Sequence, residues 1–458
     1  MSRWFPFARF PFRGDVLYKG GGKAKADPAS YRGICLSPHV TKLFEGLLGH
    51  RLTQHTEQHD TLTPYQFGSR PGKQTHDAIY TLLAAIYSND TYDASPTYCA
   101  FVDFSTAYPS THRDRLGVLL HNYGIHGKLW KLLRESFNKA RVRVLHPLIK
   151  EHEYRDILRG LPEGSRLSPT LFGVLVAELL HQLKNSFPLA QTKITNGYQW
   201  LGAIAYVDDL VLISKSPLEL QQMINTCQTW CEKSRIEISA SKTKIVVFKP
   251  KHIPPSSRQQ TNQHQWHLQH SFPTAHRVEI EQVSEFKYLG VLLDDDLSMR
   301  PLTNQILNSI QKSHLKLQAT LAELRQNNHD QSSYPGHTKI SPQVVRRLWQ
   351  SCVQIQATQY LRYIAHPPLI EEIQTKLNST LQKAFKCYGQ PTNLQADLGV
   401  PPLYTLDTRT SSAFTFASQS VTLTPWPHPS TSIASRKPPS LYRRPLTLSN
   451  TKSYNQSV

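Results

Sequence analysis

The sequence predicts an α+β fold that passes into an all-helical region and then into a polar tail. Up to about residue 300, short apolar runs typical of buried strands alternate with segments of helical spacing. After residue 300 only helical spacing remains, with one stripe of Ile306, Ile310, Leu317, Leu321 and Leu324. From about residue 420 onward Pro, Ser and Thr dominate, which predicts a disordered tail.

Local patterns predict the elements in chain order. Residues 1–30 are rich in Gly and Lys and predict turns and a mobile loop. Helical spacing predicts helices over 39–57, 74–88, 112–140, 168–185, 217–234 and a further segment at 341–390. Ser168 and Pro169 supply an N-cap and a first turn. Apolar and aromatic runs predict strands over 97–104, twice within 201–214, over 243–248 and over 286–293. Residues 249–275 predict a long loop.

The charge balance indicates a polyanionic partner. The 458 residues include 52 Lys and Arg against 33 Asp and Glu, which gives a net charge of +19. Nucleic acid is the commonest partner of such a chain, and no basic amphipathic anchor favours a membrane. The sequence has neither an apolar run near the roughly 18 residues of a transmembrane helix nor the apolar core of a secretory signal. Six sparse Cys predict a reduced, intracellular compartment.

Two adjacent carboxylates at the tip of an apolar hairpin are the sharpest chemical feature. Asp208 and Asp209 interrupt an apolar run, and divalent cations would compensate two negative charges beside buried strands. Taken alone, an exposed turn is the favoured interpretation by about two to one. Asp103 ends the strand predicted at 97–104, and side-by-side alignment would bring it near Asp208. Two Mg²⁺ ions about 3.5–4 Å apart on such carboxylates serve phosphoryl transfer; a helix cap is the alternative for Asp103.

A third segment, residues 160–172, carries two glycines and leads into the helix predicted at 168–185. Glycine lets a backbone approach a substrate closely, and a helix N-terminus favours an anion. Taken alone, a loop of this kind is by default a packing junction.

Seven segments of the chain, in their order along the sequence, resemble the motifs of the reverse transcriptase of non-LTR (LINE-type) retrotransposons. Asp103 lies in a segment that resembles the first palm motif, residues 160–172 resemble the Gly-x-Pro-Gln-Gly-Ser-x-Leu-Ser-Pro motif, and residues 206–209 resemble the Tyr-x-Asp-Asp motif. The other matching segments are 30–37 with 42–45, 66–75, 241–244 and 286–291. The match runs from about residue 15 to 300.

The resemblance implies a right-hand polymerase fold. Its parts would be fingers over 1–96, a palm with interleaved fingers elements over 97–298, an α-helical thumb or connection over 299–418, and the tail over 419–458. The implied activity is RNA-directed DNA synthesis, in which a DNA primer on an RNA template is extended with dNTPs. Two Mg²⁺ ions, or Mn²⁺ in their place, are the implied cofactors. The chain would be a fragment of a larger element, and the family's habit of copying onto chromosomal DNA implies a nuclear location.

The resemblance also assigns residues at the metals and the nucleotide. Asp103 and Asp208 would be metal ligands, and Asp209 would complete the acidic cluster. Arg32 would hold the triphosphate, because a planar guanidinium suits phosphate oxygens. Tyr108 would lie beneath the sugar and exclude a 2′-hydroxyl, with core packing as the alternative.

Further assignments by resemblance concern template and primer. Arg70 and Lys73 would contact template phosphates, with ordinary surface charge as the alternative. Tyr288, Leu289 and Gly290 would form a primer-grip hairpin, for which a simple strand-to-turn segment is the alternative.

One departure from the family pattern falls at the nucleotide. Glu163, followed by Gly164, stands where the family usually has Gln, and a carboxylate repels a triphosphate and donates no hydrogen bond. A raised pKa or Arg166 would neutralise it. The departure keeps open a second interpretation, in which the chain is an inactive reverse-transcriptase-like remnant that only binds nucleic acid.

Overall fold

A five-stranded sheet forms the centre of the α+β region in the computed structural model. The structure describes residues 12–20, 22, 24–27, 30–93, 95–138, 140–144, 154–194, 197–249, 264–270, 276–330, 340–364, 366–386, 395 and 397–403. The strand order is β15-β12-β3-β10-β9, from β15 (Glu281–Gln282) and β12 (Lys244–Phe248) through β3 (Thr97–Val102) to β10 (Asp209–Ser214) and β9 (Ala203–Tyr206). All six residues of β3 are buried, which explains its continuous apolar run.

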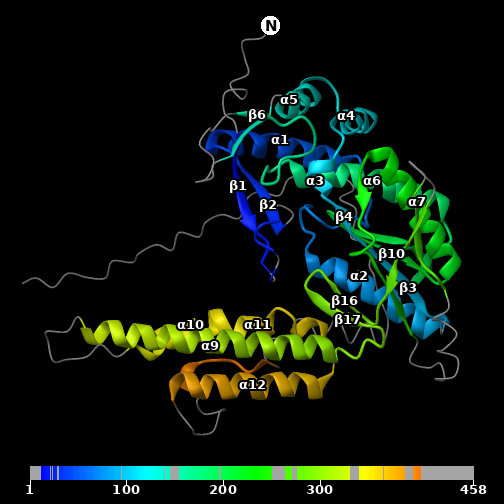
Figure 1. Cartoon of the computed structure of the whole chain (residues 1–458). Coiled ribbons are helices and arrows are strands. Elements are labelled where there is room, and N and C mark those ends of the chain that lie inside the picture. Colours follow the sequence, from blue (N-terminus) through cyan, green and yellow to red (C-terminus); the bar gives the residue numbers. More distant parts are fainter. Residues whose placement is uncertain are drawn as a thin grey trace, which may run out of the picture. The chain divides into compact units, whose positions relative to one another are not determined.

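Helices and a hairpin cover this sheet. α7 (Pro217–Ser234) packs on β3 and β10, while α6 (Ser168–Ser186) and α2 (Thr75–Ser88) pack on β9 (Figure 1). The predicted strand at 286–293 is a hairpin of β16 (Glu285–Tyr288) and β17 (Val291–Asp294). Its Phe286 ring stacks on Phe101 of β3 with centroids 4.3 Å apart.

A second sheet lies in the region expected to form the fingers. Its order is β2-β1-β5-β6, with β1 (Phe12–Tyr18), β2 (Tyr31–Leu36), β5 (Arg141–Val144) and β6 (Arg155–Asp156). The loop predicted for residues 1–30 is therefore wrong where β1 forms, because β1 finds a partner in β2. α1 (His39–Gln58) follows β2 in the chain and agrees with the helix predicted over 39–57.

The helix predicted over 112–140 is two helices. α4 (Arg113–Asn122) and α5 (Gly127–Asn138) are separated at Gly124, whose φ of +80° ends the helical path. The predicted capping role of Ser168 is also wrong, because its hydroxyl donates to the carbonyl of Pro162 and Leu167 is the N-cap.

Short elements complete this region. They are a π-helical turn (Asn89–Asp93), β4 (Phe104–Ser105), α3 (Ala107–Ser110), β7 (Gln191–Ile194), β8 (Gly197–Trp200), β11 (Glu237–Ile238), β13 (His267–His270) and β14 (His276–Glu279). β13 lies within the predicted loop 249–275, of which 250–263 and 271–275 are outside the described residues.

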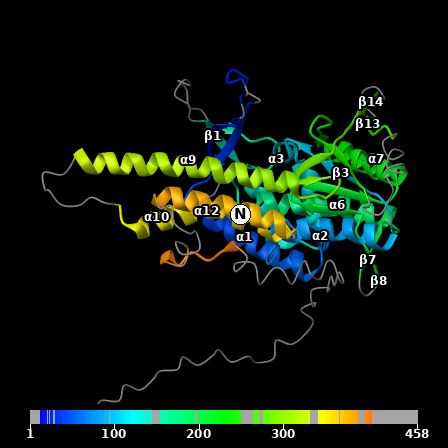
Figure 2. The ribbon, with the colours of Figure 1, turned by 90° about the horizontal axis from the view of Figure 1, so that it is seen from below.

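The region after residue 300 is helical, as predicted. It comprises α9 (Arg300–Asp330), α10 (Pro342–Trp349), a π-helical turn (Gln350–Gln354), α11 (Ile355–Thr358), a 3₁₀ turn (Leu361–Tyr363) and α12 (Pro367–Phe385). α9 and α12 lie side by side (Figure 2). The predicted stripe on α9 is buried from Ile306 to Leu321, whereas Leu324 is exposed. The predicted tail lies outside the described residues, and none of the helices described could span a bilayer.

Candidate active site

Strand register brings the predicted acidic residues together. β3 and β10 are antiparallel with Val102 opposite Leu210, so Asp103 and Asp209 are the next residues across this pair. β9 and β10 form a hairpin in which Tyr206 pairs with Asp209, and Val207 and Asp208 make its turn. Asp103, Asp208 and Asp209 therefore lie at the same end of the sheet, as expected from side-by-side alignment of the two strands. We call residues 206–209 the acidic turn.

The acidic turn has a strained backbone. Val207 has φ of +60°, a left-handed conformation that β-branched residues rarely adopt. Such strain persists only where neighbouring structure holds it and is commonest at functional sites.

Asp103 is held by residues that follow α7. Its backbone N–H donates to Thr243 Oγ1 at 3.2 Å, and its carbonyl accepts from Ser239 N at 2.9 Å. Its carboxylate receives Lys242 Nζ at 3.2 Å. An ammonium group thus occupies a position beside this carboxylate that suits a cation.

The carboxylates of the acidic turn disfavour full ionisation. Partial burial, followed by repulsion from Asp208 and Asp103, raises the pKa of Asp209 to about 6. Burial also raises the pKa of Asp208, with a further contribution from Asp103 and an opposing one from Arg32. A cation beside these groups would relieve the repulsion.

Loop 160–167 lies against α3 and β2. Cys35 of β2 donates its N–H to the Glu163 carbonyl at 2.6 Å. Gly164 has φ of +108°, and a Cβ there would lie 2.3 Å from the Cys35 carbonyl oxygen. Only glycine fits this contact, which fixes the backbone of β2 next to the loop.

Buried Glu45 of α1 holds the next part of the loop. Its carboxylate accepts from Ser165 Oγ at 2.9 Å and from the Arg166 N–H at 3.1 Å. Sequence reasoning placed Glu45 in a fingers segment without a role. The helix face that buries Glu45 also contains Thr41 and Thr56, and its partners are more than a hundred residues away, so no local pattern could have indicated the contact.

Arg32 and Glu163 face each other beside the acidic turn. Arg32 Nε lies 3.7 Å from Glu163 Oε2, and the side chains are 67% and 28% exposed. Burial raises the pKa of Glu163, and Arg32 and Lys19 oppose that rise. The raised pKa suggested for Glu163 is thus observed, and its compensating neighbours are Arg32 and Lys19 in place of Arg166.

Tyr108 lies in α3 below this pair. Its ring is half-buried against Phe172, with centroids 5.4 Å apart, and its carbonyl accepts from Leu161 N at 2.7 Å. Burial, then Asp208 and Glu163, raises the pKa of the phenol. The structure therefore brings Arg32, Tyr108, Glu163 and Gly164 together with the acidic turn.

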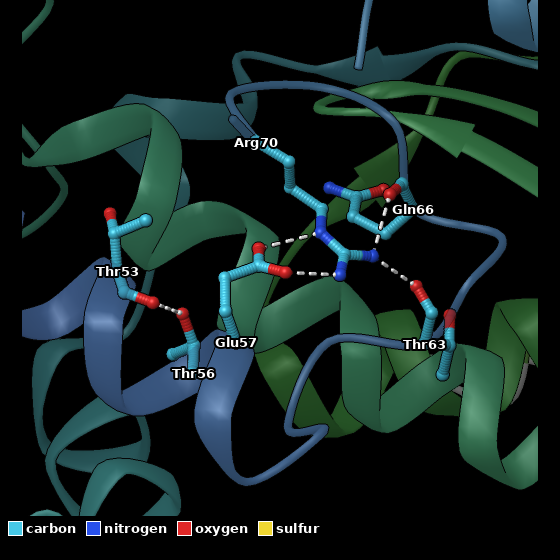
Figure 3. Close-up of polar contacts among 6 residues, drawn as sticks. All are labelled: Thr53, Thr56, Glu57, Thr63, Gln66 and Arg70. Carbon is cyan, nitrogen blue, oxygen red and sulfur yellow. Dashed lines mark hydrogen bonds and ion pairs between the residues drawn. The ribbon is translucent and has the colours of Figure 1, made fainter. Parts of the chain in front are cut away.

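Arg70, which was expected to contact template phosphates, forms its hydrogen bonds with other residues of the protein. Its Nε and Nη2 donate to the two Glu57 oxygens at 2.8 and 2.6 Å, and Nη1 donates to the carbonyls of Thr63 and Gln66 at 2.7 and 3.2 Å (Figure 3). Its side chain is only 10% exposed. Lys73 lies over the Phe67 ring with Nζ 5.2 Å from the centroid. The template contact of these residues stays a prediction.

The predicted primer-grip residues form the tip of the β16–β17 hairpin. Leu289 and Gly290 both have positive φ, which is typical of a two-residue hairpin turn. The Tyr288 ring is buried, 5.5 Å from the Phe101 ring. Gln305 of α9 donates to the Gly290 carbonyl at 3.2 Å. Of the three, Tyr288 packs beneath the sheet end, whereas the turn contacts the helical region.

The donor set of the site suits a hard divalent cation. Asp103, Asp208 and Asp209 offer carboxylate oxygens, their charges repel, and one already receives an ammonium group. Within the described residues no group of three or more His, Cys, Asp or Glu side chains is close enough to hold a metal ion. Mg²⁺ characteristically takes one or two carboxylates plus substrate phosphates, so the residues fit an ion shared with a substrate.

Comparisons with known proteins show the family to which the chain belongs. Among curated proteins, the chain is similar to the RNA-directed DNA polymerase from mobile element jockey of Drosophila funebris, with 24% identity over 87% of this chain and 40% of the relative. It is also similar to the Retrovirus-related Pol polyprotein from type-1 retrotransposable element R1 of Bradysia coprophila, with 25% identity over 62% and 26%. The chain spans 21% to 40% of the length of the curated relatives it matches.

A solved structure of telomerase from Candida albicans is similar with a TM-score of 0.42 and 11% identity, over 90% of this chain and 64% of that one. The family described as "Reverse transcriptase (RNA-dependent DNA polymerase)" matches residues 23–293. The expected resemblance to LINE-type reverse transcriptases is thereby confirmed, and with it the right-hand polymerase fold. The matched residues hold every part of the site from Arg32 to Gly290, and the chain therefore belongs to the reverse transcriptase (RNA-dependent DNA polymerase) family.

Proposed function

We propose that the chain is an RNA-directed DNA polymerase that extends a DNA primer on an RNA template with dNTPs. The observation that carries the proposal is the register of β3 and β10, which aligns Asp103 with Asp209 beside the turn that holds Asp208. The net charge of +19 supports a nucleic-acid substrate. Residues 1–96 are proposed as fingers, 97–298 as palm and 299–418 as thumb or connection, and a nuclear location is part of the same proposal.

Asp103 and Asp208, with Asp209 beside them, would hold two Mg²⁺ ions, for which Mn²⁺ could substitute. Bound there, such ions supply charge neutralisation at the triphosphate and activation of the primer 3′-hydroxyl. Lys242 would give up its contact with Asp103 when the carboxylate takes a metal ion, since the two cations compete for one group.

The remaining residues of the site would position the nucleotide. Arg32 is mostly exposed and lies near enough to Asp208 to oppose the rise of its pKa, so its guanidinium would bind triphosphate oxygens beside the acidic turn. Tyr108 is fixed by the Phe172 ring and by the Leu161 hydrogen bond, so it would present a rigid surface to the sugar. A rigid aromatic wall excludes a 2′-hydroxyl by steric contact, which favours dNTPs over NTPs.

Glu163 favours the second candidate function. A carboxylate beside Asp208 adds negative charge where a triphosphate would bind, and a remnant that only binds nucleic acid would tolerate it. The ion pair with Arg32 lowers this cost in the free protein. We therefore propose the active polymerase first and keep the binding remnant as an outcome of the test.

Primer extension tests the proposal. The full chain is given an RNA template with an annealed DNA primer, dNTPs, and Mg²⁺ or Mn²⁺. Asp208→Asn removes one carboxylate charge at constant size, while Asp295→Asn is the matched control, because Asp295 pairs with Lys249 beyond the far end of β12. We expect DNA synthesis by wild type and the control only. Salt-sensitive RNA binding without synthesis by any variant, Glu163→Gln included, would refute the polymerase and leave the remnant.

A further inference from the structure

Residues 65–68 run directly behind the acidic turn. They lie between α1 and α2 and pair with β9, where Ala205 N donates to the Tyr65 carbonyl at 2.9 Å and Phe67 N donates to the Ala205 carbonyl at 2.8 Å. This bridge adds the segment in parallel to the edge of the catalytic sheet. The strand that leads into the acidic turn therefore has the segment as its outer neighbour.

Gly68 touches the acidic turn itself. A Cβ on Gly68 would lie 2.3 Å from Val207 Cγ2, 2.4 Å from Val207 N and 2.9 Å from the Tyr206 carbonyl carbon. Real Cβ atoms do not approach a backbone this closely, so only glycine fits. The residue contacted is the strained one, Val207 at φ of +60°. Gly68 thus borders the turn at the residue that precedes Asp208.

Arg70 fixes the segment that carries Gly68. Its three guanidinium nitrogens bind the Glu57 carboxylate in the last turn of α1 and the carbonyls of Thr63 and Gln66 (Figure 3). We call these four residues the Arg70 cluster. One planar group thereby ties the end of a helix to two points of the loop that leads to Gly68, and its two-pronged contact with Glu57 is directional.

We propose that Arg70 and Glu57 are positioning residues for the acidic turn, acting through Gly68 on Val207. The cluster fixes the position of residues 65–68, and the contact of Gly68 with Val207 then fixes the backbone of the acidic turn. The position of the Asp208 carboxylate follows from that backbone. Neither residue touches the substrate. The inference rests on the proposed function for the role of the turn, whereas the mechanical coupling itself rests on the contacts described above.

Hydrogen exchange combined with kinetics tests the coupling on the full chain. Arg70→Lys keeps the charge but loses the fork, and Glu57→Gln keeps the shape but loses the charge. The control is Arg115→Lys, which weakens another half-buried arginine–glutamate pair, between α4 and α6. We expect faster amide exchange over 203–210 in the first two variants and not in the control. We also expect a roughly 10- to 100-fold fall in kcat, the scale of a small misplacement of a catalytic group, with unchanged affinity for primer–template.

Each other result decides against the proposal. Unchanged exchange over 203–210 in both variants would overturn it. A weaker affinity for primer–template at unchanged kcat would make Arg70 a template contact instead. Equal losses of melting temperature in all three variants, at wild-type kcat for the folded protein, would mean a purely structural pair. Should wild type fail to polymerise, the proposed function falls, and the exchange measurement still decides the coupling.

Discussion

Two arginine–glutamate pairs flank the acidic turn, and they are built in opposite ways. Arg70 meets Glu57 with two nitrogens at 2.8 and 2.6 Å, and its side chain is almost fully enclosed. Arg32 meets Glu163 with one nitrogen at 3.7 Å, and its side chain is mostly in solvent. The same two residue types therefore form an enclosed, directional contact in one pair and a looser, more exposed contact in the other.

The difference separates the positioning role proposed for Arg70 from the ligand-binding role proposed for Arg32. Four of the five N–H donors of Arg70 are already used within the protein, so a two-pronged contact with a phosphate would require that cluster to break. The loose pair of Arg32 can exchange its carboxylate for another anion at little cost, since exposed ion pairs contribute only about 0–1 kcal/mol. An arginine near a polymerase site is thus informative only once its partners are known.

Removing each glutamate should separate the pairs most strongly. Glu57→Ala leaves the enclosed guanidinium without its counter-ion, and we expect the free energy of unfolding to fall by about 3 kcal/mol. Glu163→Ala leaves an arginine that is already 67% exposed and stays hydrated, so it should change this free energy by less than about 0.5 kcal/mol. Urea unfolding of both variants measures this. Equal losses would show that the two pairs do not differ energetically.

Gly68→Ala should distort the acidic turn by a steric clash at Val207. The new Cβ would overlap the Val207 backbone, so we expect a loss of about 1–3 kcal/mol in stability and a loss of polymerase activity. Gly117→Ala in α4 is the control, because a Cβ there meets nothing within 4 Å. It should be neutral or slightly stabilising, by up to about 1 kcal/mol. Full activity in Gly68→Ala would contradict the close contact.

Glu163→Gln should sharpen the contrast on the exposed side. Loss of the carboxylate frees Arg32 and removes one negative charge beside Asp208, so the KM for dNTP should fall about fivefold, equivalent to about 1 kcal/mol. Steady-state extension at low and high salt measures this, and the effect should shrink as salt screens the charge. A higher KM would instead mean that Glu163 itself takes part in holding the nucleotide.

Sequence reasoning located the acidic residues because their signals are local. Apolar runs predicted β3, β9 and β10, and antiparallel pairing then places the ends of neighbouring strands together. The helix predicted over 217–234 is likewise observed as α7, in which Cys227 and Cys231 are buried. In each case the pattern within one element decided the outcome.

Pairings between distant elements could not be predicted in this way. No spacing rule joins Glu57 to Arg70 across a helix end and a loop, or Glu45 to Ser165 more than a hundred residues later. The break between α4 and α5 was missed because leucines recur at helical spacing on both sides of Gly124, within 116–120 and within 129–133. β1 was missed because its strand character comes from its partner, β2. These features depend on packing between elements, which the spacing of apolar residues within one segment does not reveal.

A buried histidine in the helical region contrasts with both arginine–glutamate pairs, because it has no partner within the described part of the chain. Its replacement should have the smallest effect on stability of the changes considered. His314 of α9 is 2% exposed, and neither ring nitrogen has a hydrogen-bond partner among the described residues. Burial, then the charges of Lys383 and Lys376 on α12, lowers the pKa of His314. The folded chain therefore takes up this proton at a lower pH than the unfolded chain, which takes it up near pH 6.5. The free energy of unfolding must then fall as the pH drops below that value, because the unfolded state binds more protons.

His314→Leu removes both the unpartnered nitrogens and the titration. We expect it to raise the free energy of unfolding by up to about 1 kcal/mol at pH 7.5. The gain should be larger at pH 5.5, where wild type also loses stability to protonation of the unfolded chain. Urea unfolding of both proteins at the two pH values measures the difference. A gain that does not grow on acidification would mean that His314 finds a partner in solution. It would then belong with Arg70, as a buried polar group whose burial is compensated by its contacts.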